Sequence, residues 1–122
     1  MTVEEFYDEI DGDFVSVKKR ITSEERLRKY FRIFADSADF PNMLDALEKK
    51  DYHAAFQCVH SMKGTCMNLG FKRLAVASGE LCEVLRPGTV NCDITDMLDE
   101  IKNQYNITVQ AINKILSEGV AK

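Results

Sequence analysis

Apolar residues recur three and four positions apart along most of the chain, which is the spacing of one face of an α-helix. The clearest case lies between Asp51, which is suited to cap a helix, and Gly70, which is suited to end one in a left-handed conformation. No run of β-branched residues alternates with polar residues, so no strand is predicted. The apolar face of this helix is expected to consist of Tyr52, Ala55, Val59, Met62, Cys66 and Leu69.

The same spacing predicts helices along the rest of the chain. Short helices are expected at about 3–10 and 13–20, and longer ones from Ser23, from Asp39, at 51–69, at 71–85 and at 93–117. Long amphipathic helices joined by short turns favour an antiparallel bundle. The sequence therefore predicts an all-α fold: a four-helix bundle over about residues 22–117, preceded by one or two short N-terminal helices, in a single domain of residues 1–122.

Composition is that of a globular domain, with 45% hydrophobic and 30% charged residues and a net charge of −4. No run of lysine and arginine suits nucleic-acid phosphates, and no apolar run approaches the ~20 residues that span a bilayer. We therefore expect neither nucleic acid nor membrane as a partner.

The acidic N-terminal sequence does not fit a secretory signal, and the spacing of the cysteines does not fit a zinc site; these are Cys58, Cys66, Cys82 and Cys92. Reduced thiols and a cytoplasmic location are expected.

One polar face of the helix at 51–69 holds the most informative residues. His60 has Lys63 three positions on and Gly64 four positions on, and such positions are neighbours on a helix. Lys63 can place its ammonium beside the imidazole, and Gly64 leaves the approach to His60 clear. A glycine inside a helix costs about 1 kcal/mol relative to alanine, so its place beside this histidine indicates a function.

Metal binding and hydrolysis do not fit this helix. His53 and His60 are seven residues apart, or ~10.5 Å along a helix, which is too far for one ion. Ser61 and Cys58 point to other faces than His60. The chain also lacks a glycine-rich nucleotide loop, so we expect no enzyme that makes its own phosphate donor. A covalent phosphate carrier remains, since neutral imidazole is a good nucleophile, and the plain alternative is a solvated surface histidine.

The stretch His60-Ser-Met-Lys-Gly-Thr-Cys-Met-Asn-Leu-Gly70 resembles the histidine-containing phosphotransfer (HPt) domains of two-component phosphorelays. In that family two residues separate the histidine from a Lys-Gly pair, and a Leu-Gly turn follows. The resemblance covers about residues 22–117 and includes the segments on either side of the stretch. It implies that His60 accepts a phosphoryl group, that Lys63 stabilises this group and that Gly64 gives a receiver domain access.

The resemblance also implies the partners. These are response-regulator receiver domains and a hybrid sensor kinase, with Mg²⁺ supplied by the receiver, no stably bound cofactor or metal on the chain itself, and a monomeric state. A docked receiver is expected to cover Gln57, Ser61, Gly64, Met67 and Gly79 around His60. For Gly79, close packing between helices is an equal alternative.

The sequence departs from the family pattern at one position. The residue 22 positions after the histidine is often Gln or Glu in HPt domains, where it bonds the other nitrogen of the ring. Here this residue is Cys82, a weak donor and acceptor, and the adjacent Glu83 or a water could take its place. Two other functions stay open: a helical protein-docking module that is not phosphorylated, and the phosphorylatable domain of a chemotaxis-type histidine kinase.

Overall fold

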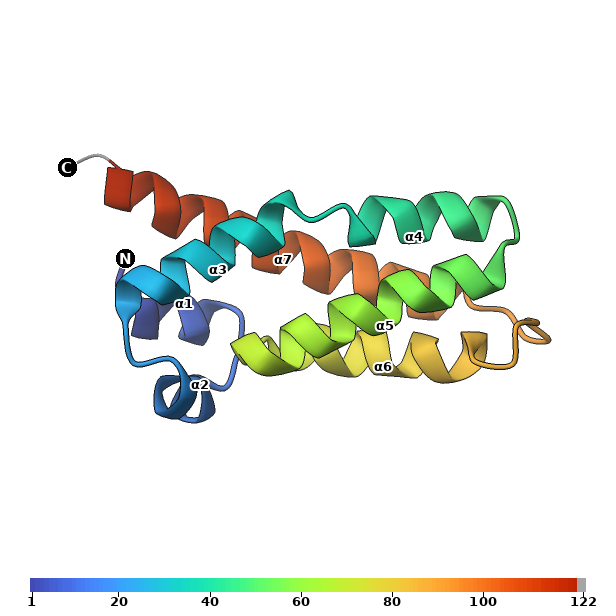
Figure 1. Ribbon diagram of the computed structural model, residues 1–122, viewed down its shortest axis with the longest axis horizontal. Helices are drawn as coiled ribbons and strands as arrows, with labels where there is room; N and C mark the ends of the chain where they lie inside the picture. Colours follow the sequence, from blue (N-terminus) through green and yellow to red (C-terminus); the bar gives the residue numbers. More distant parts are fainter. Residues whose placement is uncertain (121–122) are drawn as a thin grey trace.

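Seven α-helices and no strand make up residues 1–120, the part of the chain that the computed structural model describes (Figure 1). The all-α prediction is confirmed. The expected domain of residues 1–122 ends two residues outside the described part. The helices are α1 (Val3–Glu9), α2 (Phe14–Arg20), α3 (Glu24–Asp36), α4 (Asp39–Glu48), α5 (Tyr52–Leu69), α6 (Lys72–Leu85) and α7 (Thr95–Val120).

The predicted bundle is present, and its first arm is divided. Helices α3 and α4 lie one after the other along the same side of the molecule, and α5, α6 and α7 form the other three arms (Figure 1). Helix α5 packs between α4 and α6, while α7 packs against α6, α3 and α1. Ser37 and Ala38 separate α3 from α4, so the first arm bends instead of running straight. The short helices α1 and α2 lie at the end of the bundle where α3 begins and α5 ends (Figure 1).

Helix starts follow the side chains that cap them. The carboxylates of Asp13 and Asp51 and the hydroxyl of Ser23 each accept a hydrogen bond from a backbone N–H three residues on, at 3.0–3.2 Å. These bonds satisfy N–H groups that the first turn of a helix leaves unpaired. The predicted cap at Asp51 is confirmed, and α5 begins at the next residue, Tyr52.

Helix α5 turns its predicted apolar face to the core. Ala55, Val59, Met62, Cys66 and Leu69 are buried, and Tyr52 at the first position is half-buried. Because residues at this spacing share one side of a helix, the opposite side must face solvent. This periodicity decides which residues of α5 a partner can reach.

The C-terminal end of α5 is fixed by the N-terminal helices. Gly70 has φ of 72°, and a Cβ there would lie 2.7 Å from the carbonyl oxygen of Asp13, so only glycine fits this left-handed turn. The Tyr7 hydroxyl donates to the Leu69 carbonyl at 2.6 Å, and Arg20 donates to the Asn68 carbonyl at 2.9 Å. These contacts satisfy the last carbonyls of α5 and set the position of the helix against α1 and α2.

Candidate functional site

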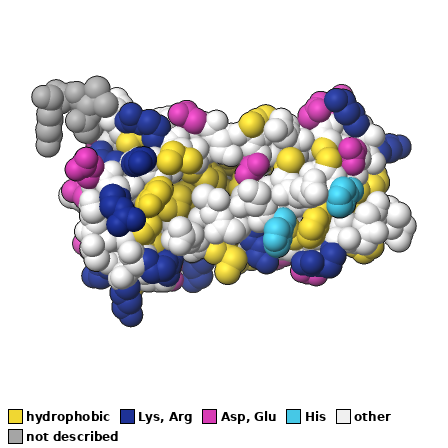
Figure 2. Space-filling model, viewed as in Figure 1, with side chains coloured by type: hydrophobic (Ala, Val, Ile, Leu, Met, Phe, Trp, Pro, Cys, Tyr) yellow, Lys and Arg dark blue, Asp and Glu magenta, His cyan; other side chains and the backbone are white. Residues whose placement is uncertain are grey.

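His60 lies on the solvent-facing side of α5, near the middle of the helix. Figure 2 shows both histidines of the chain on one face of the molecule. His60 is exposed because its neighbours in sequence, Val59 and Met62, occupy the buried side. The imidazole is therefore accessible to a partner that approaches this face.

The approach to His60 is open at Gly64. A Cβ built at Gly64 would have no atom within 4 Å, so the surface one turn after His60 is empty space. The expected docking residues Gln57, Ser61 and Met67 are exposed, and Met67 is 59% exposed although its side chain is apolar. The structure thus brings together four of the predicted docking residues around the imidazole.

Lys63 lies on the flank of this face, over α6. A Cβ at Gly79 would lie 3.5 Å from Cε and 3.8 Å from Nζ of Lys63, so the lysine stem covers this glycine. Both residues are half-buried. Gly79 therefore lies beneath Lys63 and is not an open surface like Gly64. An alanine at 79 would make an ordinary van der Waals contact, so packing alone does not demand glycine there.

Cys82, at the position where the family often has a ring-bonding Gln or Glu, is buried and cannot form part of a docking surface. It lies beside Leu81 on the core side of α6, it has no accessible surface, and burial raises the pKa of its thiol. Glu83 is exposed, but its carboxylate pairs with Arg86 at 3.0 Å. The hydrogen bond from Arg86 lowers the pKa of Glu83, and the nearby charge of Lys63 adds to this effect. Neither residue hydrogen-bonds the His60 ring.

Phe56 is the residue that contacts the imidazole, and the sequence interpretation missed it. The rings of Phe56 and His60 stack with centroids 5.5 Å apart and an interplanar angle of 15°. The Arg86 guanidinium lies over the Phe56 ring at 5.2 Å from its centroid. The available signal was the spacing, since an aromatic residue four positions before a histidine lies beside it on a helix.

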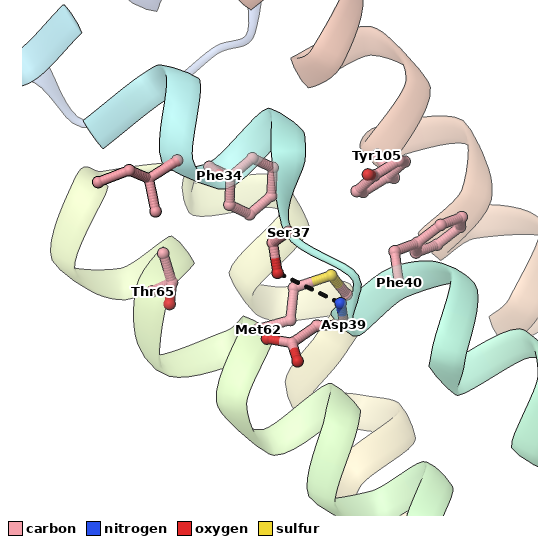
Figure 3. A pocket seen from close by; sticks show the side chains of 8 residues that line it. Phe34, Ser37, Asp39, Phe40, Met62, Thr65 and Tyr105 are labelled. Atoms are coloured by element: carbon pink, nitrogen blue, oxygen red, sulfur yellow. Dashed lines mark hydrogen bonds between the residues drawn. The ribbon is translucent and has the colours of Figure 1, made fainter. Parts of the chain in front are cut away.

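A small apolar hollow lies beside the same face, at the break between α3 and α4 (Figure 3). The ring of Phe34 lies on one side of it, the stacked rings of Phe40 and Tyr105 lie on another, and Met62 projects from α5. Its volume of about 70 Å³ is far below the ~300–1,000 Å³ of pockets that hold small-molecule ligands. Thr65 of α5 also lines it.

Three further properties concern metal binding, the cysteines and membrane spans. Across residues 1–120, no three His, Cys, Asp or Glu side chains come together as a metal site would require. The cysteines Cys58, Cys66, Cys82 and Cys92 are free thiols. In the same range no helix is both apolar enough and long enough to cross a membrane.

Comparison with models of known protein families identifies the family of the chain. The model of the Hpt domain family matches residues 29–111, which is more than half of the 122 residues, so the chain belongs to this family. The match includes α4, α5 and α6 entirely, and with them His60, Lys63 and Gly64. No curated protein and no solved structure matches the chain.

Membership in the Hpt family defines the general role. Hpt domains take part in histidine phosphotransfer in two-component systems, where they interact with receiver domains and kinases. They are phosphocarriers and not catalytic domains. The resemblance seen in the sequence is thereby confirmed at the level of the family.

Proposed function

We propose that the chain is a phosphorelay intermediate that carries a phosphoryl group on His60 between aspartates of receiver domains. One observation supports this most: within the matched Hpt segment, an exposed imidazole lies beside a glycine position with no atom within 4 Å. A receiver must bring an aspartyl phosphate to the ring, and this surface offers no side chain in the way.

The transfer is a simple exchange of bonds to phosphorus. A ring nitrogen of neutral His60 attacks the phosphorus of an aspartyl phosphate, a nitrogen–phosphorus bond forms, and the carboxylate leaves with the electron pair of the broken phosphorus–oxygen bond. Delivery runs in reverse: a carboxylate oxygen of the next receiver attacks phosphorus, and the imidazole recovers its electron pair. Catalysis of such transfer consists mainly of positioning and charge stabilisation.

The partners follow from this role. Receiver domains of response regulators and of a hybrid sensor kinase would bind the His60 face and supply the Mg²⁺ that neutralises the phosphoryl oxygens. The chain itself would act in the cytoplasm as a monomer, without a bound cofactor and without enzymatic turnover of its own.

A two-receiver exchange tests the carrier role. A receiver labelled with ³²P should transfer its label to the chain in the presence of Mg²⁺, and a second receiver added to the repurified chain should then remove it. A panel of isolated receiver domains identifies the fastest pair. A chain that no receiver labels would contradict the proposal and favour a docking module without phosphorylation.

The Lys63→Ala variant tests whether this lysine acts on the phosphoryl group. A charge-assisted hydrogen bond contributes ~1.5–3 kcal/mol in a favourable site and less where water screens it, so the transfer rate or the phosphorylated fraction should fall roughly tenfold. Lys63→Arg should recover part of the loss because it keeps the charge. Stopped reactions with labelled receiver measure both. Unchanged transfer and an unchanged phosphohistidine lifetime in Lys63→Ala would leave Lys63 without this role.

A further inference from the structure

His60 has one direct contact with its surroundings that constrains the ring, namely the stack on Phe56. The two rings are nearly parallel, at 15°, with centroids 5.5 Å apart. An exposed histidine on a helix samples several side-chain rotamers, and a neighbouring aromatic ring favours the rotamer in which the two rings stack. The stack leaves both ring nitrogens free of protein hydrogen bonds among the described residues.

The Phe56 ring is itself contacted by a side chain from the end of the neighbouring helix. Arg86, at the end of α6, places its guanidinium 5.2 Å from the centroid of the Phe56 ring. The Glu83 carboxylate accepts two hydrogen bonds from Arg86, at 3.0 and 3.4 Å. The hydrogen bonds from Arg86 also lower the pKa of the Glu83 carboxyl. Arg86 thus contacts Phe56, and Phe56 in turn contacts the imidazole of His60.

The stack on Phe56 is the contact that can orient the His60 imidazole here, because the polar residues nearby do not bond it. Cys82 is buried in the core and Glu83 is bound to Arg86, so neither orients the ring. The second histidine offers a contrast on the same helix, because His53 has Lys49 and not an aromatic residue four positions before it. Of the two histidines, only the imidazole of His60 is stacked on an aromatic ring.

We propose that Phe56, held by Arg86, is a positioning residue that sets the orientation of the His60 imidazole for transfer. This inference rests on the proposed function of His60. A ring that is oriented in advance presents its nitrogen to the incoming phosphorus without a search among rotamers. Loss of the stack should therefore slow the transfer step inside the complex and leave the affinity for the receiver almost unchanged.

The test compares Phe56→Leu with Phe56→Tyr. Leucine keeps an apolar side chain without the ring and should lower kcat of transfer from the best receiver of the panel roughly tenfold, with little change in KM. Tyrosine keeps the ring and should restore kcat to within about twofold. Phe40→Leu is the matched control: Phe40 is also half-buried and stacked, on Tyr105 with centroids 3.8 Å apart, but its ring does not stack on His60. It should change thermal stability and leave kcat unaltered.

Proton NMR of the imidazole provides a readout that needs no receiver. The His60 ring protons should be shifted upfield by the Phe56 ring, return toward free-histidine positions in Phe56→Leu, and stay shifted in Phe56→Tyr. Wild-type kcat in a folded Phe56→Leu protein, or equal losses in the leucine and tyrosine variants, would overturn the positioning role. Either result leaves the carrier role intact, since that role is tested separately by the two-receiver exchange and by the His60 variants.

Discussion

Replacing His60 by glutamine is expected to abolish phosphorylation of the chain, whereas His53→Gln should leave most of it. Glutamine is polar and of similar length but has no nucleophilic ring nitrogen. Both residues are exposed on α5, so both substitutions should preserve the fold. The measurement is the acid-labile, base-stable label gained from a ³²P-labelled receiver with Mg²⁺.

The comparison with His53 makes this prediction specific. Four residues after His53 stands Gln57, whereas Gly64 occupies that place after His60. The same assay with phosphoramidate, a small donor that needs no docking surface, separates the reactivity of each imidazole from receiver binding. Label that survives His60→Gln would end the carrier hypothesis in its present form.

The second large effect is expected from Gly64→Gln. A Cβ at this position meets no atom within 4 Å, so the variant should fold, and its helix should gain up to ~1 kcal/mol from the loss of glycine. The longer side chain leans back along α5 toward His60 and enters the space that a receiver needs. Receiver-dependent transfer should fall at least tenfold, equivalent to ~1.4 kcal/mol or more of lost docking.

Gly64→Ala provides the graded control for this variant. Its single methyl group stabilises the helix in the same way but fills little of the open space, so transfer should decline much less than in Gly64→Gln. Circular dichroism and thermal melts check folding, and stopped reactions with labelled receiver measure the rates. Exchange at the wild-type rate in Gly64→Gln would show that the open surface has no role in docking.

The fold could be predicted from local signals because most of its helices carry them in sequence. The caps Asp13, Ser23 and Asp51 and the left-handed Gly70 mark helix ends through interactions within a few residues. The apolar spacing of α5 likewise fixes which side is buried, and hence that His60 and Met67 face solvent. Each of these features depends on neighbours along one helix.

The parts that could not be predicted depend on the packing between helices. Cys82 stands where the family often has a polar residue that bonds the histidine ring, and the sequence alone did not show that this thiol is fully buried. The position of Lys63 over Gly79 and the contact of Arg86 with Phe56 both join α5 to α6. The spacing of residues along one helix gives no information on contacts between two helices. It could, however, have indicated the stack of Phe56 on His60, because both residues lie on α5.

The most direct measurement maps the phosphorylated residue by mass spectrometry. The chain is labelled by the fastest receiver of the panel with Mg²⁺ and digested at neutral to basic pH, where phosphohistidine survives. The proposed carrier role predicts one phosphoryl group, located on His60, which disappears when a second receiver is added before digestion. A phosphoryl group on His53 or on any other residue of the labelled chain would contradict it.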